Sequence, residues 1–374
     1  MKRAACLLIA ALSAAVASCA ESEPAPVDLA QLSLPAGFHI ALYAADVTGA
    51  RELALGTNGT VFVGSRGDGK VRALIDADHD GRAEKVVVIA SDLHLPSGVA
   101  FHDGDLYVGA VSRILRYRAI ESHLDAPPEP EIVTDRLPSS DSHGWKFIAI
   151  GPDGRLYVPI GAPCNICEPD KDHAKLISMK PDGSDWRDIA YGIRNTVGFD
   201  WQPGTQALWF TDNGRDQMGD DMPSDELNHL SRVGEHFGFP YCQQGDTLDP
   251  KFGKGKSCAD YTAPVLKLGA HVGSIGMRFY TGTMFPPEYR GAAIIAEHGS
   301  WNRTRKSGYR VMSVRLDGDR VLAYQPLVDG FQRNEVVFGR PADVLVMPDG
   351  ALLVADEYAG AVYRVTYDAP APHP

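Results

Sequence analysis

Residues 147–158 read Phe-Ile-Ala-Ile-Gly-Pro-Asp-Gly-Arg-Leu-Tyr-Val: a short apolar strand, a glycine turn and a second apolar strand. The pattern recurs every 40 to 50 residues or so, a period typical of a β-propeller. The turns are Gly56-Thr57-Asn58-Gly59, His102-Asp103-Gly104, Pro152-Asp153-Gly154, Gln202-Pro203-Gly204, Tyr280-Thr281-Gly282 (alternatively Tyr289-Arg290-Gly291) and Pro348-Asp349-Gly350. We therefore predict an all-β fold, a six-bladed β-propeller with four-stranded blades around a central axis.

The two ends of the chain can close this ring. The segment His39-Ile40-Ala41-Leu42-Tyr43 is apolar enough to supply the fourth strand of the last blade. Placing both termini in one blade buries two sheet edges that would otherwise be exposed. Two intervals, 212–225 and 237–267, are longer than the rest, and we expect them to form loops on the binding face.

The N-terminus has the composition of an export signal. Lys2-Arg3 precede an apolar run over residues 7–16, which is too short to span a bilayer as a mature helix. The following Val16-Ala17-Ser18-Cys19 resembles a bacterial lipoprotein signal, in which Cys19 becomes the lipidated first residue; an ordinary secretory peptide is the alternative. We expect an exported, periplasmic protein, anchored by lipid in the outer membrane.

These features divide the chain into four expected regions. They are a signal peptide over 1–18, a tether over 19–34, the propeller over 35–368 and a tail over 369–374. The chain has 36 basic and 48 acidic side chains, a net charge of −12, which argues against a nucleic-acid partner.

Export makes disulfide bonds the expected state of the four cysteines that follow Cys19. Among three pairings we choose the local ones, Cys164 with Cys167 and Cys242 with Cys258; a four-cysteine zinc site is the alternative. Glu168 follows Cys167 where covalent haem attachment requires His.

An acidic run suggests a structural calcium site. Asp76, Asp78 and Asp80 alternate along the chain, Gly81 permits a sharp turn, and Glu84 follows. Such carboxylates converge on one point, as in the first half of an EF-hand loop, although Glu is not at the twelfth position. A solvated acidic hairpin is the alternative.

Polar residues precede three of the expected inner strands. His143 lies before residues 147–150, Arg194-Asn195 before 197–201 and Arg340 before 343–346. Because the first strand of a propeller blade lies nearest the axis, we expect these side chains to converge on one central pocket. An imidazole there can accept a proton, and a guanidinium suits an anionic or carbonyl-rich ligand. Taken alone, each of these residues has a simpler interpretation: His143 as a turn residue, and an arginine as one partner of a surface ion pair.

These segments resemble the quinoprotein sugar dehydrogenases, specifically the glucose/sorbosone dehydrogenase family, which uses pyrroloquinoline quinone (PQQ). The most specific signature is Gly192-Ile193-Arg194-Asn195-Thr196 before an inner strand, with His143 upstream. The resemblance extends from about residue 30 to the end, and the sorbosone-type branch also shares both cysteine loops. The stretches that carry it are 93–101, 141–161, 191–199, 212–214, 225–228, 298–303 and 340–350.

The resemblance implies a role for each residue around PQQ and a bridging Ca²⁺. His143 resembles the general base, and Arg194 the residue that polarises the quinone carbonyl, with Asn195 as its cofactor-binding neighbour. The backbone carbonyls of Gly214 and Arg215 correspond to calcium ligands. Arg340 resembles an arginine that pairs with a PQQ carboxylate.

The family pattern is not complete in this chain. The soluble glucose enzymes place a Lys on the fifth inner strand, whereas this chain has Glu297-His298-Gly299-Ser300-Trp301-Asn302-Arg303. We expect Arg303 to replace its charge and His298 its position. Ala342 stands where the family has a second arginine.

The sequence thus predicts a PQQ- and Ca²⁺-dependent dehydrogenase. Its substrate would be an aldose, a sorbosone-like aldehyde sugar or a related polyol, and its partner a respiratory electron acceptor, a quinone or a cytochrome. The alternatives are a calcium-dependent propeller lactonase and a propeller that only binds.

Overall fold

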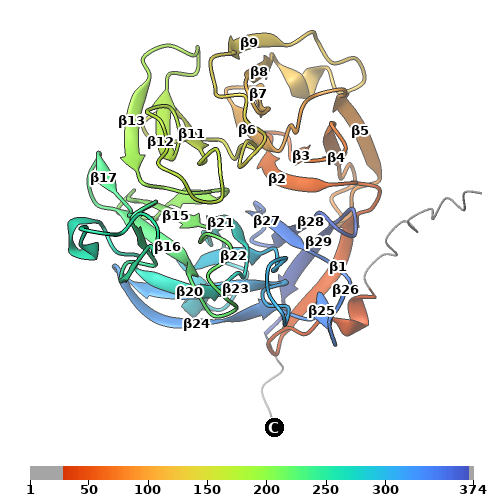
Figure 1. Cartoon of the computed structure of the whole chain (residues 1–374). Helices are drawn as coiled ribbons and strands as arrows, with labels where there is room; N and C mark the ends of the chain where they lie inside the picture. The colour runs from red at the N-terminus through yellow and green to blue at the C-terminus, as the bar shows by residue number, and fades with distance from the viewer. Residues whose placement is uncertain (1–27, 370–374) are drawn as a thin grey trace, which may run out of the picture.

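A computed structural model describes residues 28–369. Six small sheets surround a central axis, which confirms the predicted six-bladed β-propeller (Figure 1). Within this part of the chain the helices are four 3-10 turns of three residues each, and none could cross a membrane.

Each blade is an antiparallel four-stranded sheet that begins with its inner strand. The first blade is β2 (Ala50–Leu55), β3 (Val61–Ser65), β4 (Val71–Ile75) and β5 (Lys85–Ala90). The second is β6 (Gly98–His102), β7 (Asp105–Gly109), β8 (Ile114–Tyr117) and β9 (Glu131–Thr134). The third is β10 (Ala149–Ile150), β11 (Leu156–Ile160), β12 (Lys175–Met179) and β13 (Arg187–Tyr191), extended by the parallel β17 (Glu235–His236).

The other three blades follow the same plan. The fourth is β14 (Phe199–Trp201), β15 (Leu208–Asp212), β16 (Ser224–Leu230) and β20 (Leu266–Ala270). The fifth is β21 (Ser274–Phe279), β22 (Ala293–Glu297), β23 (Arg310–Asp317) and β24 (Arg320–Val328). The sixth is β27 (Pro341–Val346), β28 (Leu352–Asp356), β29 (Ala361–Tyr367) and β1 (Phe38–Ala44).

The ring closes as expected, because β1 pairs with β29 at the outer edge of the sixth blade. The described chain nevertheless joins the propeller earlier than predicted. Ser33 exchanges two backbone hydrogen bonds with Asp329, at 2.8 and 2.9 Å, and Leu32 is buried. Residues 28–34 therefore pack on the domain and are not a free tether. The predicted signal segment and Cys19 lie outside the described residues.

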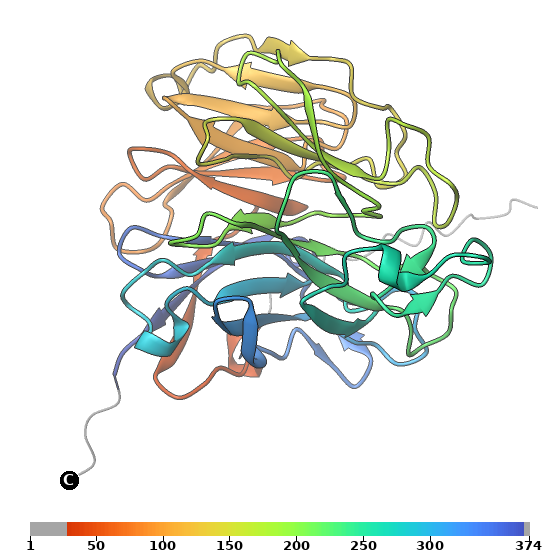
Figure 2. The ribbon, with the colours of Figure 1, turned by 90° about the vertical axis from the view of Figure 1, so that its left-hand side faces the viewer.

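The long intervals are irregular where the sequence predicted loops. Residues 213–223 connect β15 to β16 without a strand. The next interval contains β18 (Cys242–Gln243), β19 (Thr247–Leu248) and η3 (Cys258–Asp260), which project from one edge of the ring (Figure 2). In the fifth blade both candidate turns fall within one longer connection, which contains η4 (Pro287–Tyr289).

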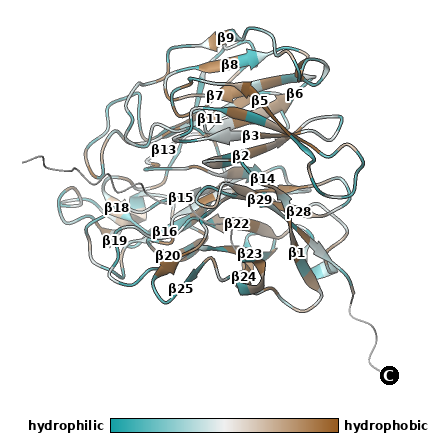
Figure 3. Ribbon diagram, turned by 90° about the vertical axis from the view of Figure 1, so that its right-hand side faces the viewer, coloured by the Kyte–Doolittle hydropathy of each residue, from teal (hydrophilic) through white to brown (hydrophobic). Residues whose placement is uncertain are grey.

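Apolar side chains fill the spaces between neighbouring sheets. Phe147, Phe199 and Phe210, for example, belong to one buried cluster that joins the third and fourth blades. The hydrophobic colouring accordingly follows the strands, and the connections are mostly hydrophilic (Figure 3).

Buried carboxylates connect the inner strands near the axis. Glu52 on β2 accepts hydrogen bonds from the N–H groups of Val99 and Ile148, at 3.0 and 2.9 Å, in the next two blades. Asp343 on β27 accepts from the N–H of Leu53 at 2.9 Å. These bonds satisfy backbone donors that no sheet ladder reaches.

Arg278 on β21 supplies the counter-charge for this network. Its guanidinium lies 3.6 Å from Glu52 and 3.4 Å from Asp343, and 4.6 Å from the centre of the Phe147 ring. One side chain of the fifth blade thus contacts the first, the third and the sixth across the axis.

Replacement of Arg278 should destabilise the fold strongly. Arg278→Met leaves two buried carboxylates without their cation, so we expect the free energy of unfolding to fall by about 3–5 kcal/mol. Burial raises the pKa of Asp343 to about 6 and that of Glu52 well above its usual range. Arg278 opposes both shifts, so its loss raises the folded-state pKa values further. A protein whose carboxyls have raised folded-state pKa values loses stability as pH rises, so the deficit relative to wild type should grow as the pH rises above about 6.

Denaturant unfolding followed by circular dichroism measures this deficit. Arg118→Met is the control, because Arg118 forms an exposed pair with Glu131 and its loss should change stability little. A deficit for Arg278→Met no larger than the control's would contradict the network's structural role.

Candidate active site

A cavity of about 450 Å³ opens on the axis, and six of the predicted residues line it. They are His143, Arg194, Asn195, Gly214, His298 and Arg340. The expected convergence of polar groups on one central pocket is therefore present. The described lining also includes Arg51, Arg66, Ser142, Trp145, Asn213, Asp216, Asp225, His271, Gly273, Ile275, Gly299, Ser300, Trp301, Asn302.

His143 is held in the tautomer that a general base requires. Its Nδ1 lies 2.8 Å from the carbonyl oxygen of Ala162. Because a carbonyl only accepts, Nδ1 carries the proton and Nε2 keeps its lone pair. Burial lowers the pKa of His143 to about 3, with a further contribution from the Arg194 cation. The imidazole is thus neutral near pH 7.

The backbone at His143 is strained, with φ at +49°. Gly161 makes room for it, because a Cβ atom there would lie 2.5 Å from the Cβ of His143. The neighbouring strand therefore fixes where the imidazole can sit.

Arg194 is buried and immobilised by hydrogen bonds on every guanidinium nitrogen. Nε donates to the carbonyl of Asn165 and Nη2 to its Oδ1, both at 2.9 Å. Nη1 donates to the carbonyl of Asn213 at 3.2 Å, and Nη2 lies 3.3 Å from Asp216. Burial lowers the pKa of Arg194, and the nearby Asp216 and Asp212 oppose that shift.

Two buried carboxylates hold the backbone around Arg194. Asp212 accepts from the N–H groups of Arg194 and Asn195, at 2.9 and 2.6 Å. Asp225 accepts from the N–H of Gly214 at 3.0 Å and from that of Ser274 at 2.9 Å. Burial raises the pKa of Asp212 to about 7 and that of Asp225 to about 6.

The opposite wall of the cavity is built on Glu357. Its carboxylate lies 2.8 Å from Arg51 and 2.5 Å from Nε2 of His298. Burial lowers the pKa of His298 to about 4, so the imidazole is neutral and donates through Nε2. Burial alone would raise the pKa of Glu357, but Arg51 and His298 outweigh it, and the net pKa is lowered. Arg340 donates to the carbonyls of His298 and Gly299, at 3.1 and 2.7 Å.

The cavity carries an excess of positive charge. Four guanidiniums line it, and ion pairs neutralise those of Arg51 and Arg194. Within residues 28–369, Arg66 and Arg340 form no ion pair; Arg66 instead lies 4.4 Å from the ring centre of Trp145. In a chain of net charge −12, such a cavity favours an anionic ligand.

Arg51, Arg66 and Trp301 were not identified from the sequence. Arg51 belongs to β2, whose residues Ala-Arg-Glu-Leu-Ala-Leu lack the apolar pattern of a strand. Trp301 lines the cavity, and its side chain is 75% exposed. Its place three residues after His298 was a signal that could have identified it from the sequence.

Two predicted residues do not line the cavity. Arg303 pairs with Asp221 at 3.0 Å, so its charge is not directed at the pocket. The side chain of Arg215 pairs with buried Asp249 at 2.8 Å. The predicted role of the Arg215 carbonyl as a metal ligand stays a prediction.

The acidic run also comes together in space, between β4 and β5. Asp76, Asp78, Asp80 and Glu84 each offer an oxygen within 4.8 Å of the others. Hydrogen bonds inside the loop, such as Gly81 N–H to Asp76 Oδ2 at 3.0 Å, support the same shape. The geometry is compatible with the predicted calcium and equally with a hydrated acidic loop.

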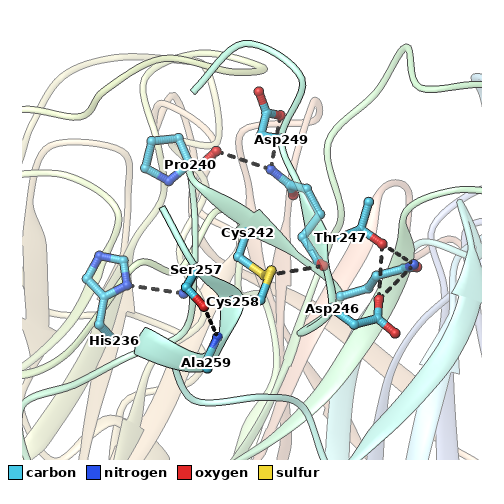
Figure 4. The surroundings of a disulfide bond; sticks show 12 residues. His236, Pro240, Cys242, Asp246, Thr247, Asp249, Ser257, Cys258 and Ala259 are labelled. Atoms are coloured by element: carbon cyan, nitrogen blue, oxygen red, sulfur yellow. Dashed lines mark hydrogen bonds between the residues drawn. A yellow bond between two sulfur atoms is a disulfide. The ribbon is translucent and has the colours of Figure 1, made fainter. Parts of the chain in front are cut away.

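Both predicted disulfides are present. Cys164–Cys167 closes a loop of four residues beside Arg194, and Cys242–Cys258 closes the projecting segment. Figure 4 shows Asp249 near the second disulfide; its Oδ2 accepts from the Gln243 amide at 3.3 Å, as well as from Arg215. The first loop contacts Arg194, whereas the second contacts Arg215, the neighbour of the lining residue Gly214. No residue of the 237–267 interval lines the cavity, so the expectation that this interval lies on the binding face is wrong.

Comparisons with known proteins place this geometry in a family. The sequence matches the TrAA12-like family over residues 32–338. A Borreliella burgdorferi protein of uncharacterised function is 31% identical over 90% of this chain and 91% of its own length. The aldose sugar dehydrogenase YliI of Escherichia coli is 27% identical over 60% of this chain and 58% of its own.

Solved structures share the fold at 19% identity. The holo PQQ domain of pyranose dehydrogenase from Coprinopsis cinerea has a TM-score of 0.78 and covers 92% of this chain and 99% of that one. The PQQ-bound aldose sugar dehydrogenase of Streptomyces coelicolor has a TM-score of 0.65, with 90% and 100% covered. None of these proteins bears the name of a sorbosone dehydrogenase, so that branch stays a prediction. The solved sugar dehydrogenases share the fold of this chain, so the predicted resemblance to the soluble quinoprotein enzymes is confirmed at the level of the fold. The chain belongs to the TrAA12-like family.

Proposed function

We propose that this protein is a PQQ- and Ca²⁺-dependent sugar dehydrogenase. The observation that carries the proposal is the cationic axial cavity in which a neutral imidazole, His143, lies beside an immobilised cation, Arg194. Sugar dehydrogenases among its relatives support a sugar as the substrate class.

The cavity residues fit PQQ, an aromatic tricarboxylate. Arg66 and Arg340 offer unpaired guanidiniums, and the buried Nε of Arg51 has no hydrogen-bond partner in residues 28–369. Planar guanidiniums bind carboxylates through two parallel hydrogen bonds, so Arg51, Arg66 and Arg340 would hold the cofactor. When bound, PQQ would supply a quinone carbonyl able to accept one hydride, which is a proton with two electrons, from the sugar carbon.

Calcium would be held beside Gly214. Both oxygens of Asp225 already accept backbone N–H groups, so the backbone carbonyls of Gly214 and Arg215 are the proposed ligands. A lactonase would need acidic side chains free to hold its metal, which this bonding pattern disfavours.

The chain's own residues would then divide the chemistry between a base and a fixed charge. Nε2 of His143 takes the proton from the sugar hydroxyl while the carbon is oxidised. Arg194, which cannot reorient, stabilises negative charge that develops in the cavity. The exposed indole of Trp301 offers an apolar face to the sugar ring at the cavity mouth.

The cellular setting is part of the proposal. The sequence supports an exported lipoprotein anchored through Cys19 in the periplasm, which passes electrons to a respiratory quinone or cytochrome. Membrane fractionation of a Cys19→Ser variant tests the anchor; a variant that stays with the membrane would exclude it.

Reconstitution tests the function directly. Apoprotein titrated with PQQ and Ca²⁺ should acquire a quinone absorbance that bleaches when an aldose is added, and EGTA should prevent it. Calorimetry should detect a second calcium site that Asp78→Asn removes without loss of bleaching. Lactone hydrolysis without a quinone spectrum would support the lactonase instead. If the protein shows neither activity, the remaining alternative is a propeller that only binds its ligand.

Loss of the base should abolish turnover but not cofactor binding. His143→Gln should lower kcat by about 10²- to 10⁴-fold, because general base catalysis contributes on that order. His123→Gln is the matched control, since exposed His123 also bonds a backbone carbonyl through Nδ1, at 2.9 Å. PQQ absorbance titrations check binding in both variants.

The pH profile of the free enzyme provides an independent test of His143. Its pKa of about 3 keeps the imidazole deprotonated throughout the neutral range, so His143 should give kcat/KM no acid limb between about pH 5 and about pH 8. An acid limb near pH 6.5 that His143→Gln removes would contradict the buried, neutral base.

Loss of the exposed indole should weaken sugar binding. Trp301→Ala should raise KM for the sugar roughly 3- to 10-fold, with kcat little changed, because stacking contributes to binding and not to chemistry. Steady-state kinetics measures both constants. Leu322→Ala, another exposed apolar side chain of the fifth blade, is the control. An unchanged KM for Trp301→Ala would remove Trp301 from the sugar site.

A further inference from the structure

One short segment touches both of the residues to which the proposed function assigns chemistry. The carbonyl of Ala162 accepts from Nδ1 of His143, and its N–H donates to the carbonyl of Arg194, both at 2.8 Å. Three residues later, Asn165 accepts from Arg194 through its carbonyl and its Oδ1. The distance between the base and the cation therefore depends on how residues 161–165 are held.

Asn165 uses every polar atom of its side chain in this arrangement. Its Oδ1 also accepts from the N–H of Asp216 at 2.8 Å, and its Nδ2 donates to the carbonyl of Asp216 at 3.2 Å. The carboxylate of Asp216 is the ion-pair partner of Arg194. Asn165 thus fixes the guanidinium and its counter-ion at the same time.

The disulfide determines the shape of this loop. Cys164 and Cys167 flank Asn165 and Ile166, with their Cα atoms 6.1 Å apart. Cys164 and Ile166 pack against a buried cluster of Ala162, Ala174 and Phe239. A covalent link across a loop this short leaves the backbone of Asn165 few alternative conformations.

Gly161 completes the contact at the other end of the segment. A Cβ there would lie 2.5 Å from the Cβ of His143 and 3.3 Å from the carbonyl oxygen of Arg194. The segment therefore meets the base and the cation at van der Waals distance as well as through hydrogen bonds.

We infer that residues 161–167, closed by the Cys164–Cys167 disulfide, form a positioning bracket in which Asn165 fixes Arg194 relative to His143. The expected effect of the bracket on turnover rests on the proposed function. Its expected effect on the position of Arg194 rests on the hydrogen bonds alone. Asn165 is a positioning residue, since it acts through Arg194.

A double-mutant cycle tests the effect on turnover. Asn165→Ala should lower kcat about 10- to 100-fold, the range expected when a reacting group is misplaced by about 1 Å, while KM for the sugar and PQQ affinity change little. In an Arg194→Lys background the same substitution should have almost no further effect. Equal losses in both backgrounds would overturn the inference, because a merely structural role is additive.

Two further variants separate positioning from general destabilisation. Cys164→Ser/Cys167→Ser should reduce kcat in the same direction without removing Asn165; variants are preferable to thiol reductants, which react with quinones. Gln202→Ala removes a buried amide that bonds the Gly318 carbonyl at 3.0 Å, at the far end of β14. It should lower the unfolding temperature but leave kcat unchanged, and a matching loss of kcat would count against a specific bracket.

Nitrogen-15 NMR of the arginine Nε–H groups tests the bracket without any turnover. The Arg194 signal, assigned by its absence in Arg194→Lys, should be protected from solvent exchange in the full chain and lose protection in Cys164→Ser/Cys167→Ser. Unchanged protection would overturn the bracket whatever the activity. Lost protection in a protein that oxidises no sugar would uphold the bracket and refute the proposed function.

Discussion

Buried charge at the axis is the constraint on which the rest of this propeller depends. Arg278 reaches from the fifth blade to Glu52 and Asp343 in the first and sixth, and Glu52 in turn accepts N–H groups of the second and third. A buried charge without its partner is costly, so these contacts specify how five of the six blades, all except the fourth, are oriented about the axis. This network adjoins the cavity, since Arg51, which lines the cavity, precedes Glu52 on β2.

A repeated carboxylate at the end of the second strand orders the cavity. Asp212 ends β15 and accepts the N–H groups of Arg194 and Asn195. Asp356 ends β28 and accepts that of Arg340 at 2.8 Å. Each carboxylate fixes the residues that precede the inner strand of its own blade. The repeat that builds the fold therefore also preorganises the groups that the proposed chemistry uses.

The sequence predicted those parts of the site that lie next to the regular repeats. The glycine turns and apolar strands predicted the blade number and the closing strand, and the polar residues before recognisable inner strands, His143, Arg194 and Arg340, meet in the cavity. Arg51 was missed because β2 contains buried charged side chains, so its sequence has the composition of a loop and not of a strand. Arg303 was expected to replace a charge near the cavity, but its partner, Asp221, comes from a loop that no periodicity places. Asn165 could not be identified from the sequence either, because its importance lies in its contacts with Arg194 and Asp216. These two residues lie 29 and 51 positions further along the chain.

The same carboxylates explain why the cavity remains cationic inside an acidic protein. Asp212, Asp225 and Asp356 face or flank the site, but backbone N–H groups occupy their oxygens, and burial raises the pKa of each to between about 6 and about 7. Among the described residues, none of these three carboxylates forms an ion pair with Arg66 or Arg340. Glu357 and Asp216 neutralise Arg51 and Arg194, whereas Arg66 and Arg340 have no acidic partner among the described residues. An anionic, planar ligand such as the proposed cofactor would supply the negative charge that these two guanidiniums lack.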